Sequence, residues 1–117
     1  MGTHTHLEVT PGPSGEGTVV LDIGDSRGAA IVFTPGSLAG FEIEIRPAGG
    51  AWDGTHTGIR RRDLRDAVAY AGVFGSLEAG EYQLRLRGTP VDRAGPGTVV
   101  ALTVVGGEIT EVAWPGV

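Results

Sequence analysis

The segment LEAGEYQLRLR (residues 77–87) decides the fold class of this sequence. It alternates after its first half, with Tyr82, Leu84 and Leu86 on one face, and this alternation predicts a half-buried β-strand. The opposite face of the strand carries the polar residues Glu81, Gln83, Arg85 and Arg87. Gly80, directly before the strand, is suited to the positive φ of a chain-reversing corner. We expect the Tyr82 hydroxyl to bond back to that corner, as in the tyrosine corner of Greek-key sandwiches.

Further short β-rich segments surround this strand, and turns rich in glycine and proline separate them. The residues FEIEIR (41–46) alternate most clearly and predict a strand whose apolar side chains, Phe41 among them, face inward. The remaining strands are expected at residues 3–9, 18–23, 29–33, 52–59, 67–74, 98–105 and 108–114. Residues 60–66 (RRRDLRD) are so charged that we expect a polar connection there. Its arginines would either clamp an oxyanion or pair locally with Asp63 and Asp66.

Two glycines, Gly106 and Gly107, separate the last two predicted strands. Type I′ turns need a positive φ at both central residues, so this pair predicts a hairpin in which Val104 lies opposite Ile109. About eight or nine short strands without a convincing helix predict a single all-β domain over residues 1–117. We expect an antiparallel Greek-key β-sandwich of the prealbumin-like or immunoglobulin-like type.

Composition limits the classes of function. The net charge of −5 argues against binding to nucleic acid, which requires a basic surface. Cysteine is absent, which excludes disulfides and thiolate metal sites, and we expect a reducing, cytoplasmic compartment. There is neither a secretory signal nor an apolar run of the ~20 residues that cross a bilayer, so the sequence predicts a soluble protein without a membrane-spanning segment. All basic residues are arginine, a bias that indicates a GC-rich bacterial genome.

The corner motif LEAGEY (77–82), with the strand at 98–105 and the segment GGEIT (106–110), resembles the C-terminal part of prealbumin-like modules. These include carboxypeptidase regulatory-like domains and the Cna-B repeats of bacterial surface proteins, and the resemblance implies their sandwich fold. The transthyretin-like 5-hydroxyisourate hydrolases are similar in starting with a Thr-His strand, to which Thr5-His6 or Thr3-His4 would correspond. Those enzymes end on a Tyr-Arg-Gly-Ser tail that completes their active site, whereas this chain reads WPGV (114–117), which puts that activity in doubt.

All three histidines of the chain, His4, His6 and His56, follow a threonine. His4 and His6 are two positions apart in a predicted strand and so project from one face. Imidazole is the commonest ligand of zinc and copper, so a neighbouring strand with His56 would complete a metal site, with Glu8 or Asp53 as a carboxylate. An open coordination position would make that site a metal-assisted hydrolase. The alternative interpretation is an exposed edge strand and an unrelated loop histidine, without a cofactor.

The segment GDSRG (24–28) matches the Gly-x-Ser-x-Gly pattern of serine hydrolases, including enzymes of the phospholipase type. In α/β-hydrolases this pattern forms a strand-to-helix elbow that presents the serine to a histidine. Here AAIVF (29–33) follows and predicts a strand, so a hairpin turn is the favoured interpretation. A Ser26 nucleophile with His56 as its base is the alternative.

These patterns favour a non-catalytic binding or assembly module over an enzyme. We expect the module to use an edge strand or a loop rim, because unpaired strand edges are ready pairing surfaces. Its partner would be another protein or a second copy of the chain, and the sequence identifies no small-molecule ligand. The alternatives are a metal-assisted hydrolase at His4, His6 and His56, and a serine hydrolase at Ser26.

Overall fold

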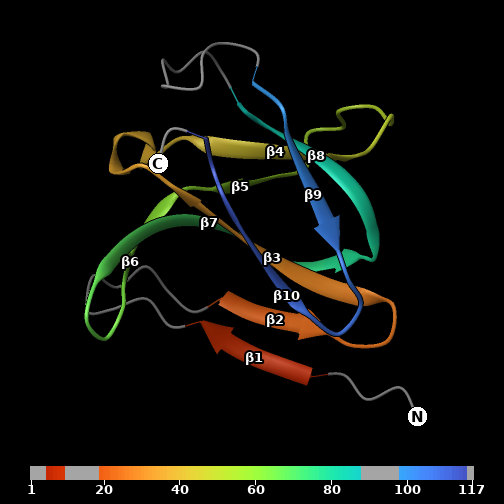
Figure 1. The fold of residues 1–117 in the computed structure, drawn as a ribbon, viewed down its shortest axis with the longest axis horizontal. Coiled ribbons are helices and arrows are strands. Elements are labelled where there is room, and N and C mark those ends of the chain that lie inside the picture. The colour runs from red at the N-terminus through yellow and green to blue at the C-terminus, as the bar shows by residue number, and fades with distance from the viewer. Residues whose placement is uncertain (1–4, 10–18, 88–97, 116–117) are drawn as a thin grey trace.

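The computed structural model describes residues 5–9, 19–87 and 98–115, which form a sandwich built almost entirely of β-strands (Figure 1). Its elements are β1 (Thr5–Val9), β2 (Val19–Ile23), β3 (Arg27–Thr34), the short 3-10 helix η1 (Gly36–Leu38), β4 (Glu42–Pro47), β5 (His56–Gly58), β6 (Arg60–Asp63), β7 (Val68–Glu78), β8 (Gly80–Leu86), β9 (Val100–Val104) and β10 (Ile109–Ala113). The prediction of an all-β sandwich is confirmed. Within these ranges no helix is long and apolar enough to span a membrane.

The described strands form two four-stranded sheets and a separate pair. The first sheet, called the β3 sheet, has the order β10-β3-β7-β6, and the second, called the β8 sheet, has the order β5-β4-β8-β9. The separate pair is β1 with β2. All neighbouring strands run antiparallel except β10 and β3, which are parallel. The Greek-key and prealbumin-like parts of the prediction stay predictions.

Strand β3 carries apolar side chains on both faces because it lies between two layers. Ala30 and Val32 belong to the core between the two sheets. Ala29 and Ile31 instead pack with Leu21 of β2, which lies against the other face of the β3 sheet. A strand that is covered on both sides needs no alternation of polar and apolar residues, which accounts for the continuous run AAIVF.

The main core fills the space between the two sheets. Its buried members are Ala30, Val32, Leu38, Ile43, Ile45, Ile59, Phe74, Leu84, Leu102, Val104 and Trp114. Ile43 is fully buried and Ile45 nearly so, as the alternation of residues 41–46 predicted. The same prediction is wrong for Phe41, which is 39% exposed, because β4 begins only at Glu42.

The chain crosses from the β3 sheet to the β8 sheet at the corner between β7 and β8 (Figure 1). Gly80 takes a φ of +153° there, in the range that favours glycine. The Tyr82 hydroxyl donates a hydrogen bond of 2.7 Å to the backbone oxygen of Glu78, so the predicted tyrosine corner is confirmed. The backbone N–H of Ala79 donates to the Ser26 oxygen at 2.7 Å, which ties this corner to the turn between β2 and β3.

The segment Gly106-Gly107 does not form the predicted hairpin. Strand β9 pairs with β8 in one sheet and β10 pairs with β3 in the other, so the expected pairing of Val104 with Ile109 is wrong. The glycines instead allow the backbones of two turns to pack closely against each other. A Cβ atom on Gly106 would overlap the backbone oxygen of Asp25 in the β2–β3 turn, and only glycine allows this packing.

Residues 60–63 form a strand and not the polar connection that their charge predicted. Strand β6 pairs antiparallel with β7, and its Arg62 is only 6% exposed. Ile59, which joins β5 to β6, is 1% exposed and carries the chain between the two sheets. An edge strand can carry charged residues because side chains on its outer face contact water. The charges of residues 60–63 therefore gave no sign of a strand in the sequence. Of the strand expected at residues 52–59, only His56–Gly58 form a strand, which is β5.

Candidate functional site

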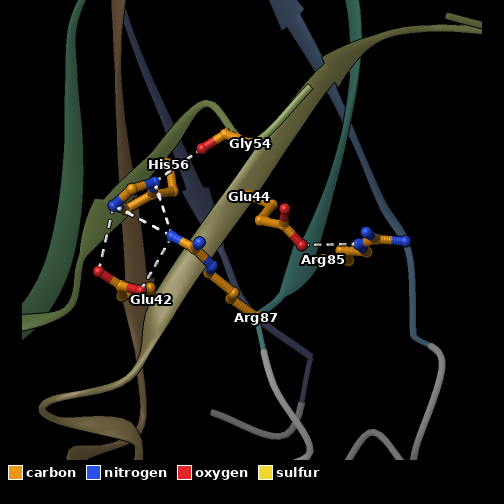
Figure 2. Close-up of polar contacts among 6 residues, drawn as sticks. All are labelled: Glu42, Glu44, Gly54, His56, Arg85 and Arg87. Carbon is orange, nitrogen blue, oxygen red and sulfur yellow. Dashed lines mark hydrogen bonds and ion pairs between the residues drawn. The ribbon is translucent and has the colours of Figure 1, made fainter. Parts of the chain in front are cut away.

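The outer face of the β8 sheet carries an array of polar side chains. Strands β4 and β8 place Glu44 opposite Arg85 and Arg46 opposite Gln83. Because the intervening residues face the core, these side chains lie on the solvent side of the sheet, as the sequence predicted for β8. We define the polar face as Glu42, Glu44, Arg46, Trp52, His56, Gln83, Arg85 and Arg87; Figure 2 shows part of it.

His56, on the short strand β5, contacts three residues at one side of the polar face (Figure 2). Its Nδ1 is 2.7 Å from the Gly54 oxygen, and its Nε2 is 3.2 Å from Glu42 Oε2. Arg87 Nη1 lies 3.3 Å from Glu42 Oε1 and 3.0 and 3.3 Å from the two ring nitrogens. The imidazole therefore lies between a carboxylate and a guanidinium. All three side chains are more than a third exposed, so each contact stabilises the fold by less than about 1 kcal/mol.

The predicted three-histidine site falls only partly within the described residues. His4 lies outside them, and for His6 the backbone position in β1 alone is described. Strand β1 pairs with β2, whereas β5, which carries His56, pairs with β4. In the described ranges no group of three or more histidine, cysteine, aspartate or glutamate side chains is arranged to hold a metal ion. A zinc or copper site at His4, His6 and His56 stays a prediction.

A second group of the polar face surrounds Trp52, in the loop between β4 and β5. The guanidinium carbons of Arg46 and Arg85 lie 4.5 and 4.2 Å from the centre of the indole ring. Both distances are within the range of a cation–π interaction. Arg85 Nε also donates to Glu44 Oε1 at 2.9 Å, and the Glu44 side chain is only 11% exposed (Figure 2). Trp52 thus contacts two guanidinium groups on the polar face.

Arg46 differs from Arg85 in that its recorded hydrogen-bond partners are neutral. Its Nε donates to Gln83 Oε1 at 2.8 Å and its Nη1 donates to the Gly50 oxygen at 2.9 Å. The nearby acid Asp53 is engaged in its own turn, where Oδ1 accepts from the backbone N–H of Thr55 at 3.0 Å and its hydroxyl at 2.7 Å. These hydrogen bonds hold the pKa of Asp53 below its ordinary value. Among the described residues, no acid in direct contact with Arg46 therefore balances its charge.

The segment GDSRG forms a tight turn, as its glycine, aspartate and serine content predicted. Gly24 and Arg27 exchange two backbone hydrogen bonds of 2.9 and 2.8 Å, and β3 begins at Arg27. A strand follows and not a helix, so the segment lacks the geometry of a nucleophile elbow. Ser26 is exposed, and no hydrogen bond in the described part of the chain joins its hydroxyl to a histidine.

The arginines of β6 do not all lie on one surface. Arg62 is buried, whereas Arg61 is exposed on the opposite face of the strand. Arg61 Nε lies 3.0 Å from Asp63 Oδ1, so the local pairing that the sequence predicted is found for this acid. Arg61 and Arg62 therefore do not contact the same oxyanion, and a clamp that includes Arg60 and Arg65 stays a prediction.

Strand β9 forms an edge of the β8 sheet and has an unusual composition. It pairs with β8 on one side, and no strand of the described ranges pairs with its other side. Leu102 and Val104 are buried in the core. The side chains that face outward on and beside the strand are all exposed: Val99, Ala101, Thr103 and Val105. The outer face of the sheet therefore changes from charged on β4 and β8 to mainly apolar at β9.

Sequence reasoning missed Trp52 as the centre of a group with Arg46 and Arg85. The available signal was the presence of an arginine at an outward position of each of two predicted strands. The register of β4 against β8, which brings those positions together, is a long-range property that neither segment encodes by itself. The edge position of β9 was hidden by the glycine pair that suggested a hairpin.

Comparisons of the chain with protein-family models, with curated proteins and with solved structures gave no match. The similarity of residues 77–110 to prealbumin-like modules therefore stays a prediction. Two surfaces of the sandwich are the candidates for function. These are the polar face and the edge of β9.

Proposed function

We propose that the chain is a non-catalytic assembly module that pairs with a second copy of itself through the edge of β9. The observation that supports this function is the composition of residues 99–105 (VVALTVV), which contain no charge, proline or glycine. Natural edge strands are commonly protected against pairing by charges, prolines or bulges. An edge strand without these features is suited to the addition of another strand.

A two-fold axis at Leu102 gives this pairing a self-complementary register. In an antiparallel arrangement, Val99 of one copy lies opposite Val105 of the other, and Ala101 lies opposite Thr103. Val99 and Val105 are 48% and 43% exposed in the single chain, and the pairing covers both. The two β8 sheets then join into one continuous sheet, with the outer apolar residues of β9 at its centre.

The expected affinity is modest. Each apolar cross-strand pair contributes only about 0.2–1 kcal/mol, and contacts made by one strand give small interfaces. We therefore expect a dissociation constant on the order of 10–100 µM, which corresponds to a reversible dimer.

Sedimentation velocity over about 1 to 500 µM protein tests the proposal, because it spans the expected dissociation constant. The variant Ala101→Lys places two like charges diagonally across the two-fold axis, and we expect it to weaken the dimer at least about tenfold. Ala67→Lys, an exposed position in the turn between β6 and β7, is the control for the added charge. A wild-type protein that stays monomeric over the whole range, or an equal effect of the two variants, overturns the proposal.

A further inference from the structure

The group around Trp52 has an excess of positive charge that no contact in the described part of the chain neutralises. Arg46 and Arg85 both lie against the same indole ring, and like charges held at one ring repel each other. One carboxylate, that of Glu44, contacts Arg85, and the recorded partners of Arg46 are neutral. An anionic group placed between the two arginines would remove this repulsion.

The two guanidinium groups keep hydrogen-bond donors available for such a group. Each guanidinium has five N–H donors in a planar fork, which matches the oxygens of a carboxylate, sulfate or phosphate. In the recorded contacts Arg46 uses Nε and Nη1, which leaves Nη2. Arg85 uses Nε for Glu44, which leaves both terminal nitrogens, and its side chain is 41% exposed. The indole holds both forks in position before any ligand arrives.

A hollow of about 300 Å³ beside Arg46 does not extend this group, because neither Trp52 nor Arg85 lines it. Its apolar lining includes Ile45, Leu77 and Tyr82, whose side chains pack with the core and not on the polar face. The acids Asp53 and Glu78 also line the hollow, so negative charge close to Arg46 disfavours a second negative charge on the ligand.

We propose that Arg46, Trp52 and Arg85 form a binding site for a small ligand with a single oxyanion group, a carboxylate or a sulfate or phosphate ester. The oxyanion binds the free donors of the two arginines, and the apolar part of the ligand contacts the indole. This site lies on the polar face of each chain and does not depend on pairing through β9.

The two tryptophans of the chain allow a direct test by ¹H–¹⁵N NMR of the indole N–H signals. Trp114 is 1% exposed in the core and serves as the internal reference, and Trp52→Phe assigns the other signal. The wild-type protein is titrated with sodium acetate, sodium sulfate and inorganic phosphate at an ionic strength held constant with sodium chloride. We expect a saturable shift of the Trp52 signal with at least one of these anions and none of the Trp114 signal.

A matched pair of variants separates the site from general charge effects. Arg46→Gln should weaken the apparent affinity about tenfold, because it removes charge-assisted hydrogen bonds. Arg61→Gln removes the same charge from β6, on the other sheet, and should leave the affinity unchanged. If the contacts of Trp52 with Arg46 and Arg85 serve only to hold the loop between β4 and β5 in place, no anion shifts the Trp52 signal saturably. That result, or an equal response of both variants, overturns the proposal.

Discussion

Removing the hydroxyl of Tyr82 tests whether the corner between β7 and β8 depends on its side-chain hydrogen bond. The hydroxyl donates to the Glu78 oxygen at 2.7 Å, and Phe keeps the ring while it deletes this bond. A hydrogen bond of this kind contributes about 1 kcal/mol net, so we expect Tyr82→Phe to lower the free energy of unfolding by that amount. For a domain of this size the corresponding fall in Tm is roughly 4 °C.

Urea unfolding followed by tryptophan fluorescence measures this change, because Trp114 is buried in the core. Tyr70→Phe is the matched control, since no hydrogen bond of the Tyr70 hydroxyl is recorded in the described part of the chain. We expect the control to change the free energy of unfolding by less than about 0.5 kcal/mol. Equal effects of the two substitutions would refute the role of the corner bond.

The same residue predicts how stability depends on alkaline pH. Burial, and to a lesser degree the charge of Glu78, raises the pKa of Tyr82, whereas Arg27 lowers it. The folded state therefore holds the phenol proton more tightly than the unfolded state. The resulting stability is complete below the unfolded pKa near 10 and is lost as the pH rises from there through the folded pKa. Tyr82→Phe should abolish this part of the alkaline loss.

Four other substitutions have expected outcomes. Gly106→Ala should destabilise the fold by about 2 kcal/mol or more, because its Cβ overlaps the neighbouring turn; thermal unfolding measures this loss. Leu84→Ala, at a fully buried position, should lower the free energy of unfolding in urea by about 3 kcal/mol. Its control is Leu64→Ala, at a 52% exposed position, which should lower the same free energy by less than about 0.5 kcal/mol. The hydrogen bonds from Thr55 lower the pKa of Asp53, so their contribution is present above the unfolded pKa and is lost as the pH falls through the folded pKa. An NMR titration of the Thr55 amide should therefore show a midpoint below 3.8 that Asp53→Asn abolishes.

Local patterns were sufficient to predict the fold class and the best-defined elements. Tyr82 and Leu84 fall on the inner face of β8 and Ile43 on that of β4, because strand alternation is a property of neighbouring residues alone. The tyrosine corner was also predictable, since Gly80 and Tyr82 are close together in the sequence. The interpretation of GDSRG as a turn was confirmed for the same reason.

Features that depend on distant segments were predicted poorly. The Gly106-Gly107 pair indicated a hairpin, but its glycines are needed for contact with a turn that lies far away in the sequence. The charges of β6 concealed a strand because pairing with β7 outweighs their unfavourable local pattern. The cluster of Trp52 with Arg46 and Arg85 likewise requires the register of β4 against β8, two strands that are neighbours in the sheet but far apart in the sequence.

The parallel pairing of β10 with β3 has a consequence for the order in which the protein folds. Ala29 and Ile109, which are partners in this ladder, stand about 80 residues apart, so their contact closes a loop that spans most of the domain. During synthesis β3 emerges long before β10, and the edge of β3 that pairs with β10 lacks this partner until β10 leaves the ribosome. We therefore expect the completion of the β3 sheet to be a late, slow event of folding. A nascent chain that lacks β10 exposes the flank of β3 to chaperones or to other chains.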